Sequence, residues 1–169
     1  MHPERKNIRL PAPRYTGRGI HFLTFCCENR RPVFSDPARA NWLISSLRGL
    51  SNANDFNIHA FCIMPDHAHF LLEGRHDAWD LLHFAKTFKQ ISAFHFKKET
   101  GERLWQRSYY DHILRPSESL DAVAWYIWLN PVRAGICQSV KEYPYSGSFT
   151  VKWDSVASPA NVWTPPWNR

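Results

Sequence analysis

Two histidines, His67 and His69, lie two residues apart inside the apolar run 64–72. In a β-strand, residues i and i+2 point to the same face, so both imidazoles can approach one point while Ala68 and Phe70 face the opposite way. Neutral imidazole nitrogens are common metal ligands. The spacing therefore predicts half of a metal site, for which other elements must provide the remaining ligands.

A second group of chemically active residues lies in the segment 125–131, Trp-Tyr-Ile-Trp-Leu-Asn-Pro. Tyr126 and Asn130 are four residues apart, so in a helix they lie on the same side, one turn from each other. The amide oxygen of Asn130 is a hard metal ligand, and the phenol of Tyr126 is a nucleophile that can carry a phosphoryl group as an ester. Two imidazoles and one oxygen leave positions open for a phosphodiester on Mg²⁺, Mn²⁺ or zinc.

Each of these residues also has a purely structural interpretation. A His-x-His pair on a strand is more often structural than metal-binding, Tyr126 can pack against its tryptophan neighbours, and Asn130 before a proline can simply end the helix. Tyr109 and Tyr110 compete with Tyr126 for the role of nucleophile, but neither has a ligand-type residue at helical spacing. A satisfied structural histidine is the ordinary interpretation of His112.

Periodicity and end signals predict the elements that position these residues. Strands are expected at 19–27, 56–64, 67–73 and 109–115, and helices at 35–50, 77–98 and 116–130. The second and third strands are separated only by Pro65-Asp66 and are expected to form a hairpin. The order β-α-β-β-α-β-α is typical of an α+β, ferredoxin-like sandwich, with a central antiparallel sheet and helices packed on it.

The composition indicates one globular domain. The chain has 169 residues, of which 44% are apolar and 15% aromatic, enough for a substantial core. No apolar run approaches the roughly 18–20 residues needed to span a bilayer, and the amino terminus lacks the apolar stretch of a signal peptide. We therefore expect a cytoplasmic protein without a membrane partner. The four cysteines lack metal-knuckle or disulfide spacing and are expected to be reduced thiols.

The charge pattern favours a polyanionic partner. Lysine and arginine number 21 against 15 aspartate and glutamate, which gives a net charge of +6. Arginine alternates with aromatic residues most densely at 103–110, a mixture typical of proteins that bind single-stranded nucleic acid. Core aromatics with solvated charges between them would give the same pattern.

The same reading divides the chain into three parts. We expect a flexible basic arm at 1–18, a folded domain at 19–150 and a tail at 151–169. The tail is rich in tryptophan and proline, and it either lies over the cleft or is a disordered end.

Together these segments resemble a known family. Residues 64–72, Met-Pro-Asp-His-Ala-His-Phe-Leu-Leu, resemble the His-hydrophobe-His (HUH) signature of single-tyrosine transposases of the IS200/IS605 type. Residues 105–115 (Trp-Gln-Arg-Ser-Tyr-Tyr-Asp-His-Ile-Leu-Arg), 126–135 (Tyr-Ile-Trp-Leu-Asn-Pro-Val-Arg-Ala-Gly) and 143–146 (Tyr-Pro-Tyr-Ser) are similar to segments of the REP-associated tyrosine transposases. The resemblance covers roughly residues 15–150 and implies the HUH endonuclease fold.

The resemblance implies a specific chemistry. His67 and His69 match the family's metal-binding pair, Tyr126 its nucleophile and Asn130 the position of its third metal ligand, with Mg²⁺ or Mn²⁺ as the cofactor. Such an enzyme belongs to the bacterial nucleoid, cuts single-stranded DNA beside hairpins of REP-like palindromes and holds one end as a 5′-phosphotyrosine. The expected DNA contacts are eight basic or imidazole side chains: Arg14, Arg18, Lys86, Lys89, Arg103, Arg107, His112 and Arg115.

Two other functions stay open on the sequence alone. The first is a domesticated, non-catalytic protein that binds hairpin DNA or RNA. The second is a metal-dependent hydrolase that uses the histidine pair to activate water and forms no protein adduct. The sequence is also compatible with a monomer or with a homodimer whose subunits exchange helices to build the site.

Overall fold

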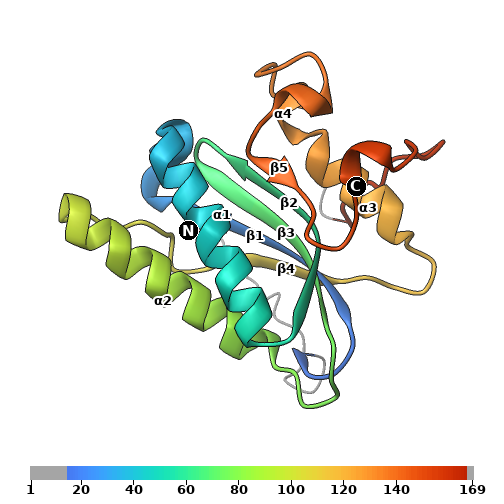
Figure 1. The fold of residues 1–169 in the computed structure, drawn as a ribbon, viewed down its shortest axis with the longest axis horizontal. Coiled ribbons are helices and arrows are strands. Elements are labelled where there is room, and N and C mark those ends of the chain that lie inside the picture. Colours follow the sequence, from blue (N-terminus) through green and yellow to red (C-terminus); the bar gives the residue numbers. More distant parts are fainter. Residues whose placement is uncertain (1–14, 167–169) are drawn as a thin grey trace, which may run out of the picture.

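The centre of the molecule is an antiparallel sheet. The computed structural model describes residues 15–166. Five strands follow the order β4-β1-β3-β2-β5 (Figure 1). They are β1 (Ile20–Cys26), β2 (Phe56–Met64), β3 (His67–Gly74), β4 (Tyr110–Ile113) and β5 (Ser146–Gly147). The predicted α+β fold with a central antiparallel sheet is confirmed, and β5 is an edge strand that the sequence did not reveal.

The strand register decides which side chains share a face. Met64 pairs with His67 across the hairpin of β2 and β3, so only Pro65 and Asp66 connect the two strands. On the other side of β3, β1 pairs Thr24 with His69 and Cys26 with His67. Directly paired residues in an antiparallel sheet point to the same face. The two histidines therefore share their face with Thr24 and Cys26.

Two long helices cover the opposite face of the sheet. These are α1 (Pro37–Ala53) and α2 (Leu81–Thr100). Asp36 caps α1 by accepting from the amide of Ala38, and Pro37 occupies the first turn, where a proline is tolerated. The start of α2 is later than predicted, because the side chain of Asp80 accepts from the amides of Leu82 and His83 and fixes the first turn there. Gly101 ends α2 with a φ of 77°, a conformation that favours glycine.

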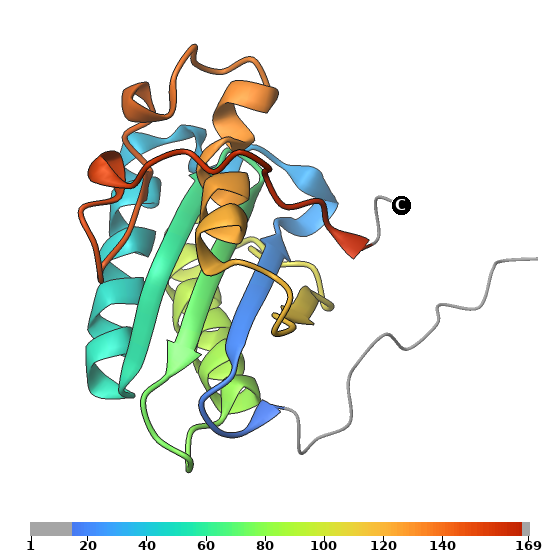
Figure 2. The same ribbon diagram turned by 90° about the vertical axis from the view of Figure 1, so that its right-hand side faces the viewer.

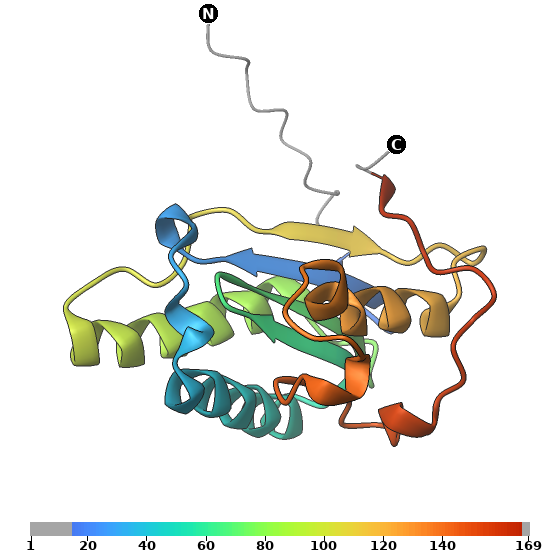
Figure 3. The same ribbon diagram turned by 90° about the horizontal axis from the view of Figure 1, so that it is seen from above.

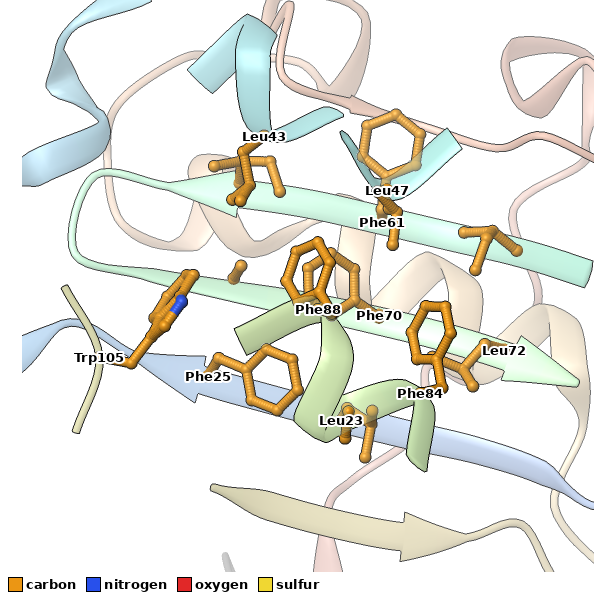
Figure 4. Close-up of a cluster of buried hydrophobic side chains, with 14 of the residues drawn as sticks. Leu23, Phe25, Leu43, Leu47, Phe61, Phe70, Leu72, Phe84, Phe88 and Trp105 are labelled. Atoms are coloured by element: carbon orange, nitrogen blue, oxygen red, sulfur yellow. The ribbon is translucent and has the colours of Figure 1, made fainter. Parts of the chain in front are cut away.

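The main core lies between these helices and the sheet. Figure 4 shows phenylalanines of α2 inserted against side chains of β1 and β3. Phe88 is central, with its ring 5.8 Å from that of Phe25 and 5.3 Å from that of Phe70. Rings at these separations attract one another beyond the area that they bury. Ala68 and Phe70 thus face this core, as predicted from the alternation of β3.

The face that carries the histidines has a thinner cover. It is formed by α3 (Leu120–Trp128), the short α4 (Asn130–Arg133) and the chain after β5, which Figure 2 shows crossing in front of the strands. Ser119 caps α3 by accepting from the amide of Ala122. The predicted helix 116–130 is thus shorter and is split at Leu129. Four short 3-10 turns complete the structure that the described residues form in the loops: Glu28–Arg30, Val33–Ser35, Val140–Glu142 and Trp153–Ser155.

Both predicted flanking segments are partly packed into the domain. Residues 15–18 were expected in a flexible arm, but Tyr15 is 2% exposed and its hydroxyl donates to Asp111 at 2.6 Å. The basic composition of this segment predicted flexibility, but the buried ring and the bonded hydroxyl of Tyr15 hold it against the domain. In the tail, the indole of Trp125 donates to the carbonyl of Ala157 at 2.9 Å. Over the described residues, no helix combines the length and apolarity of a membrane span.

Candidate active site

A pocket of about 280 Å³ opens on the thinly covered face, at the ends of β1 and β3. It is lined by Thr24, Cys26, Arg30, His67, His69, Tyr110, Tyr126 and Asn130. The structure therefore brings together the two histidines from β3 with the tyrosine and the asparagine from the α3–α4 region. These four residues come from parts of the chain that are about sixty positions apart.

The two imidazoles converge on one point. The Nε2 atoms of His67 and His69 are 3.1 Å apart, and the ring planes are inclined by 82°. Two ligand atoms that are about 2.1 Å from one cation and at right angles to each other lie about 3 Å apart. The 3.1 Å between the two Nε2 atoms is therefore compatible with both nitrogens binding the same divalent cation.

Each histidine is oriented through its other ring nitrogen. Nδ1 of His69 is 2.7 Å from the hydroxyl of Thr24, and Nδ1 of His67 is 2.6 Å from a carboxylate oxygen of Asp66. The guanidinium of Arg30 holds the second oxygen of Asp66 at 3.0 Å. A carboxylate behind a histidine fixes the ring and raises its strength as a ligand. Both Nε2 atoms are thereby directed into the pocket.

Burial keeps the imidazoles in the uncharged form that binds metal. It is the largest cause that lowers the pKa of His67, where the carboxylate of Asp66 acts in the opposite direction. The pKa of His69 lies well below its ordinary value, first through burial and then through the charges of His67 and Arg133. A neutral imidazole offers a free lone pair near neutral pH without the cost of losing a proton.

Asn130 stands where the helix is interrupted. Pro131 has no amide hydrogen, so it cannot bond the carbonyl of Ile127 as a continuing helix would require. The side-chain nitrogen of Asn130 donates to that carbonyl and to the carbonyl of Tyr126, each at 3.1 Å. This leaves the amide oxygen for the pocket, where burial has the larger effect on the pKa of His69 and lowers it, while Asn130 acts in the upward direction.

Asn130 adds an amide oxygen to the donor atoms that line the pocket. Among the described residues, no three His, Cys, Asp or Glu side chains gather closely enough to hold a metal ion. A cation at the histidine pair would therefore rely on a ligand of another type. Asn130 provides a hard oxygen of the kind that Mg²⁺ and Mn²⁺ accept.

Tyr126 lies beside the histidine pair and packs against neighbouring rings. Its ring centre is 6.4 Å from that of His69 and 6.0 Å from that of Phe22. The guanidinium carbon of Arg133 is 4.3 Å from the centre of the same ring. Burial raises the pKa of the Tyr126 phenol, while the nearby positive charge of Arg133 opposes that shift. The phenol is therefore protonated at neutral pH in the free protein.

The C-terminal tail reaches the same tyrosine. The indole of Trp163 meets the ring of Tyr126 edge-on, with centres 5.2 Å apart. Its nitrogen donates to Glu118 at 2.8 Å, and the other oxygen of Glu118 is 2.8 Å from Nε2 of His112. Figure 3 shows the tail passing the end of α3 and returning toward β4. The described part of the tail therefore packs against Tyr126, one of the residues that line the pocket.

The residues that were predicted to contact DNA are dispersed. Arg103 and Arg107 line a second, polar pocket of about 320 Å³ beside the first, together with Glu28, Asn29, Gln106 and Ser108. Lys89 donates to the carbonyls of Gln106 and Arg107 and so supports this segment.

The other predicted contacts lie elsewhere. Lys86 is exposed on α2, across the sheet from the histidine pair, and Arg115 is exposed after β4. Arg18 pairs with Asp77 at 3.3 Å, and His112 is held by Glu118. Arg14 lies outside the described residues.

Several residues of the site were not identified from the sequence. Four of them reach the site only through contacts between segments distant in sequence, which no local pattern predicts: Thr24, Cys26, Arg30 and Trp163. Asp66 was treated as a turn residue. Its position directly before the His-x-His pair was a usable signal, because a carboxylate next to a ligating histidine commonly supports it.

Comparison with known proteins places this architecture in a class. The family model described as "Transposase IS200 like" matches residues 17–130. The chain belongs to this family of transposases.

The relatives make the assignment more particular. The REP-associated tyrosine transposase of Escherichia coli K12 is 26% identical over 136 residues, which cover 78% of each protein. A Haemophilus influenzae relative, provisionally named as a REP-associated tyrosine transposase, is 26% identical over 143 residues, covering 78% of this chain and 81% of the relative. A solved structure of a REP-associated tyrosine transposase bound to a REP hairpin has a TM-score of 0.68 at 21% identity, covering 84% of this chain and 82% of that one. The resemblance to REP-associated tyrosine transposases is confirmed.

Proposed function

We propose that this protein is a metal-dependent endonuclease and strand transferase that acts on single-stranded DNA beside REP-like hairpins. The observation that carries the proposal is the convergence of His67, His69, Asn130 and Tyr126 in one pocket. A histidine pair alone would be compatible with a structural role. A pair that shares a pocket with an amide oxygen and a phenol has the composition of a cleavage site for phosphodiesters.

The residues have distinct roles in the proposed reaction. His67, His69 and Asn130 hold Mg²⁺ or Mn²⁺, and the bound cation supplies neutralisation of the non-bridging phosphate oxygens. The oxygen of Tyr126 forms a bond to phosphorus, and the bond from phosphorus to the 3′ oxygen breaks. The phenolic proton is balanced by protonation of the departing 3′ oxygen. The products are a 5′-phosphotyrosine and a free 3′-hydroxyl, and attack by another 3′-hydroxyl reverses the chemistry and joins strands.

The surroundings of the pocket support a single-stranded substrate. The solved structural neighbour is bound to a REP hairpin, and the net charge of +6 attracts a polyanion. Next to the cleft, Arg103 and Arg107 combine with amide side chains in the second pocket. Cations of this kind contact phosphates, whereas amides pair with base edges. We propose that the four groups act within one copy of the protein, because one chain brings them to the same pocket.

The test is a covalent trapping assay. A labelled REP-like hairpin with a single-stranded flank is incubated with the protein and Mn²⁺ or Mg²⁺, and the products are separated on a denaturing gel. We expect a protein–DNA adduct with the wild type and with Tyr110→Phe, but not with Tyr126→Phe. Tyr110 is the matched control because it also lines the pocket. An adduct in Tyr126→Phe that disappears in Tyr110→Phe would reassign the nucleophile.

Two outcomes of the same assay correspond to other functions. Cleaved DNA without any adduct in the wild type indicates a hydrolase that activates water at the histidine pair. Hairpin binding without cleavage under every metal indicates a non-catalytic binding protein. Either result would overturn the proposal.

A further inference from the structure

Arg133 makes two contacts with Tyr126, and the proposed chemistry does not use it. Its Nη2 atom donates to the carbonyl of Tyr126 at 2.7 Å. Its guanidinium carbon lies 4.3 Å from the centre of the Tyr126 ring. One planar group thus contacts both the backbone and the side chain of the same residue.

The break between α3 and α4 makes this arrangement available. In an uninterrupted helix, the carbonyl of Tyr126 would accept from the backbone amide of residue 130. Here α3 ends at Trp128. The carbonyl of Tyr126 instead accepts from the side chains of Asn130 and Arg133, at 3.1 and 2.7 Å. The same interruption therefore positions Asn130 in the pocket and directs Arg133 back to the tyrosine.

Arg133 is not held by an opposite charge. Across residues 15–166, no carboxylate forms an ion pair with it, although ten such pairs involve other basic or imidazole groups. An arginine that served only to stabilise the surface would gain more from a carboxylate partner. Its described contacts are those that restrain Tyr126.

We propose that Arg133 is a positioning residue for strand cleavage, acting through Tyr126. This inference rests on the proposed role of Tyr126 as the nucleophile. The guanidinium plane limits rotation of the phenol ring, so the hydroxyl is presented at the pocket before DNA binds. Nucleophilic attack requires near-contact distance and alignment, and a displacement of about 1 Å can cost about a hundredfold in rate. Lysine keeps the charge but has neither the plane nor the fork of donors.

The test compares Arg133→Lys and Arg133→Ala with the wild type in single-turnover adduct formation. We expect the maximal rate at saturating hairpin to fall about ten- to a hundredfold in both variants. The Kd for the hairpin and its dependence on salt are expected to stay unchanged. Added ethylguanidinium is expected to restore part of the rate of Arg133→Ala. A purely structural loss would not respond to this small cation.

A matched control is Arg48→Lys. Arg48 stacks on Phe149, with its guanidinium carbon 3.9 Å from the ring centre, and it belongs to α1, which covers the face of the sheet opposite the pocket. The Arg48→Lys substitution removes an equivalent stacking contact and should leave the rate of adduct formation unchanged. Wild-type rates in Arg133→Lys would overturn the proposal. So would a salt dependence that becomes shallower by about one ion in Arg133→Ala with a normal maximal rate, because that pattern reports a phosphate contact.

A readout without DNA separates this inference from the proposed function. With 3-fluorotyrosine at position 126, the fluorine resonance should be shifted and broadened in the wild type. In Arg133→Ala it should be narrower and closer to that of the free amino acid. If the wild type forms no adduct but the resonances differ in this way, the proposed function fails while the restraint of Tyr126 stands. Identical resonances would overturn the positioning role.

Discussion

The two faces of the sheet differ in what covers them. One face is covered by α1 and α2, of 17 and 20 residues, which bury a continuous set of aromatic and aliphatic side chains. The other is covered by α3, of nine residues, the short α4 and a folded-back tail. Only the second face contains the pocket with the histidine pair. A heavily packed face can hold the strands in register while the thinner one leaves room for a substrate.

The difference also appears in how polar groups are treated. On the pocket face, His67 and His69 each have a partner at both ring nitrogens. On the helix-covered face, His21 is completely buried and neither ring nitrogen has a hydrogen-bond partner among the described residues. Buried polar atoms without partners cost free energy. The two imidazoles with oriented rings thus lie on the face where chemistry is proposed, and the buried imidazole of His21 lies on the other face.

The largest expected effect separates the faces by function. Replacing His69 by alanine removes a proposed metal ligand. Loss of a group that only hydrogen-bonds to a ligand typically costs about ten- to a hundredfold, so the rate of adduct formation should fall by more than this. Metal-dependent protection against thermal unfolding should disappear with it. The control is His83→Ala, which changes an exposed histidine on α2. An active His69→Ala variant would mean that the pair does not hold the cation.

The next effect concerns stability without chemistry. Phe88→Ala removes a fully buried ring that packs on Phe25 and Phe70, and should lower the free energy of unfolding by about 3–5 kcal/mol. Urea titration followed by fluorescence measures this change. The fraction that stays folded should still form the adduct at the wild-type rate. A loss of rate in the folded fraction would show that the faces are not independent.

A third effect is the pH dependence of stability through His21. Burial, and secondarily the charge of His112, lowers the pKa of His21 from 6.5 to about 4. Between these values the unfolded chain binds a proton that the folded protein excludes. The free energy of unfolding therefore keeps the full contribution of neutral His21 above pH 6.5. It falls by about 3 kcal/mol in total as the pH falls toward 4. Urea unfolding at several pH values should show this loss. In His21→Leu, the free energy of unfolding should depend less steeply on pH over the same range.

The smallest expected effect is at the support of the pair. Asp66→Asn keeps the size of the side chain but removes the charge that orients His67 and pairs with Arg30. Metal affinity, measured by calorimetry with Mn²⁺, should fall about ten- to a hundredfold. Asp77→Asn is the control, since Asp77 forms an exposed pair with Arg18. Equal affinities in both variants would indicate that Asp66 serves only the turn.

Local patterns were sufficient for four of the five strands, for the two long helices and for half of the site. The alternation of β3 and the two-residue turn before it placed both imidazoles on one face. The four principal candidates meet in one pocket. Their roles as ligands and nucleophile stay predictions for the experiments above.

The remaining part of the site depends on contacts that are distant in sequence. Arg30 reaches Asp66 because Asn29 and Arg30 both adopt a φ of 54°, a left-handed turn that nothing in Glu-Asn-Arg-Arg requires. Trp163 reaches Tyr126 from beyond the predicted domain boundary at residue 150. Such contacts follow from packing in three dimensions, so periodicity along the chain does not disclose them.

The hairpin of β2 and β3 has a consequence for tolerance to changes in length. Surface turns usually accept inserted residues, but here Pro65 and Asp66 are the whole connection between Met64 and His67. Side chains alternate strictly along a strand, so one added residue that shifted the register of β3 would send both imidazoles toward Phe88 and bring Ala68 and Phe70 to the pocket. The length of this turn therefore sets which face the imidazoles occupy, and we expect relatives with a working site to keep two residues between the strands.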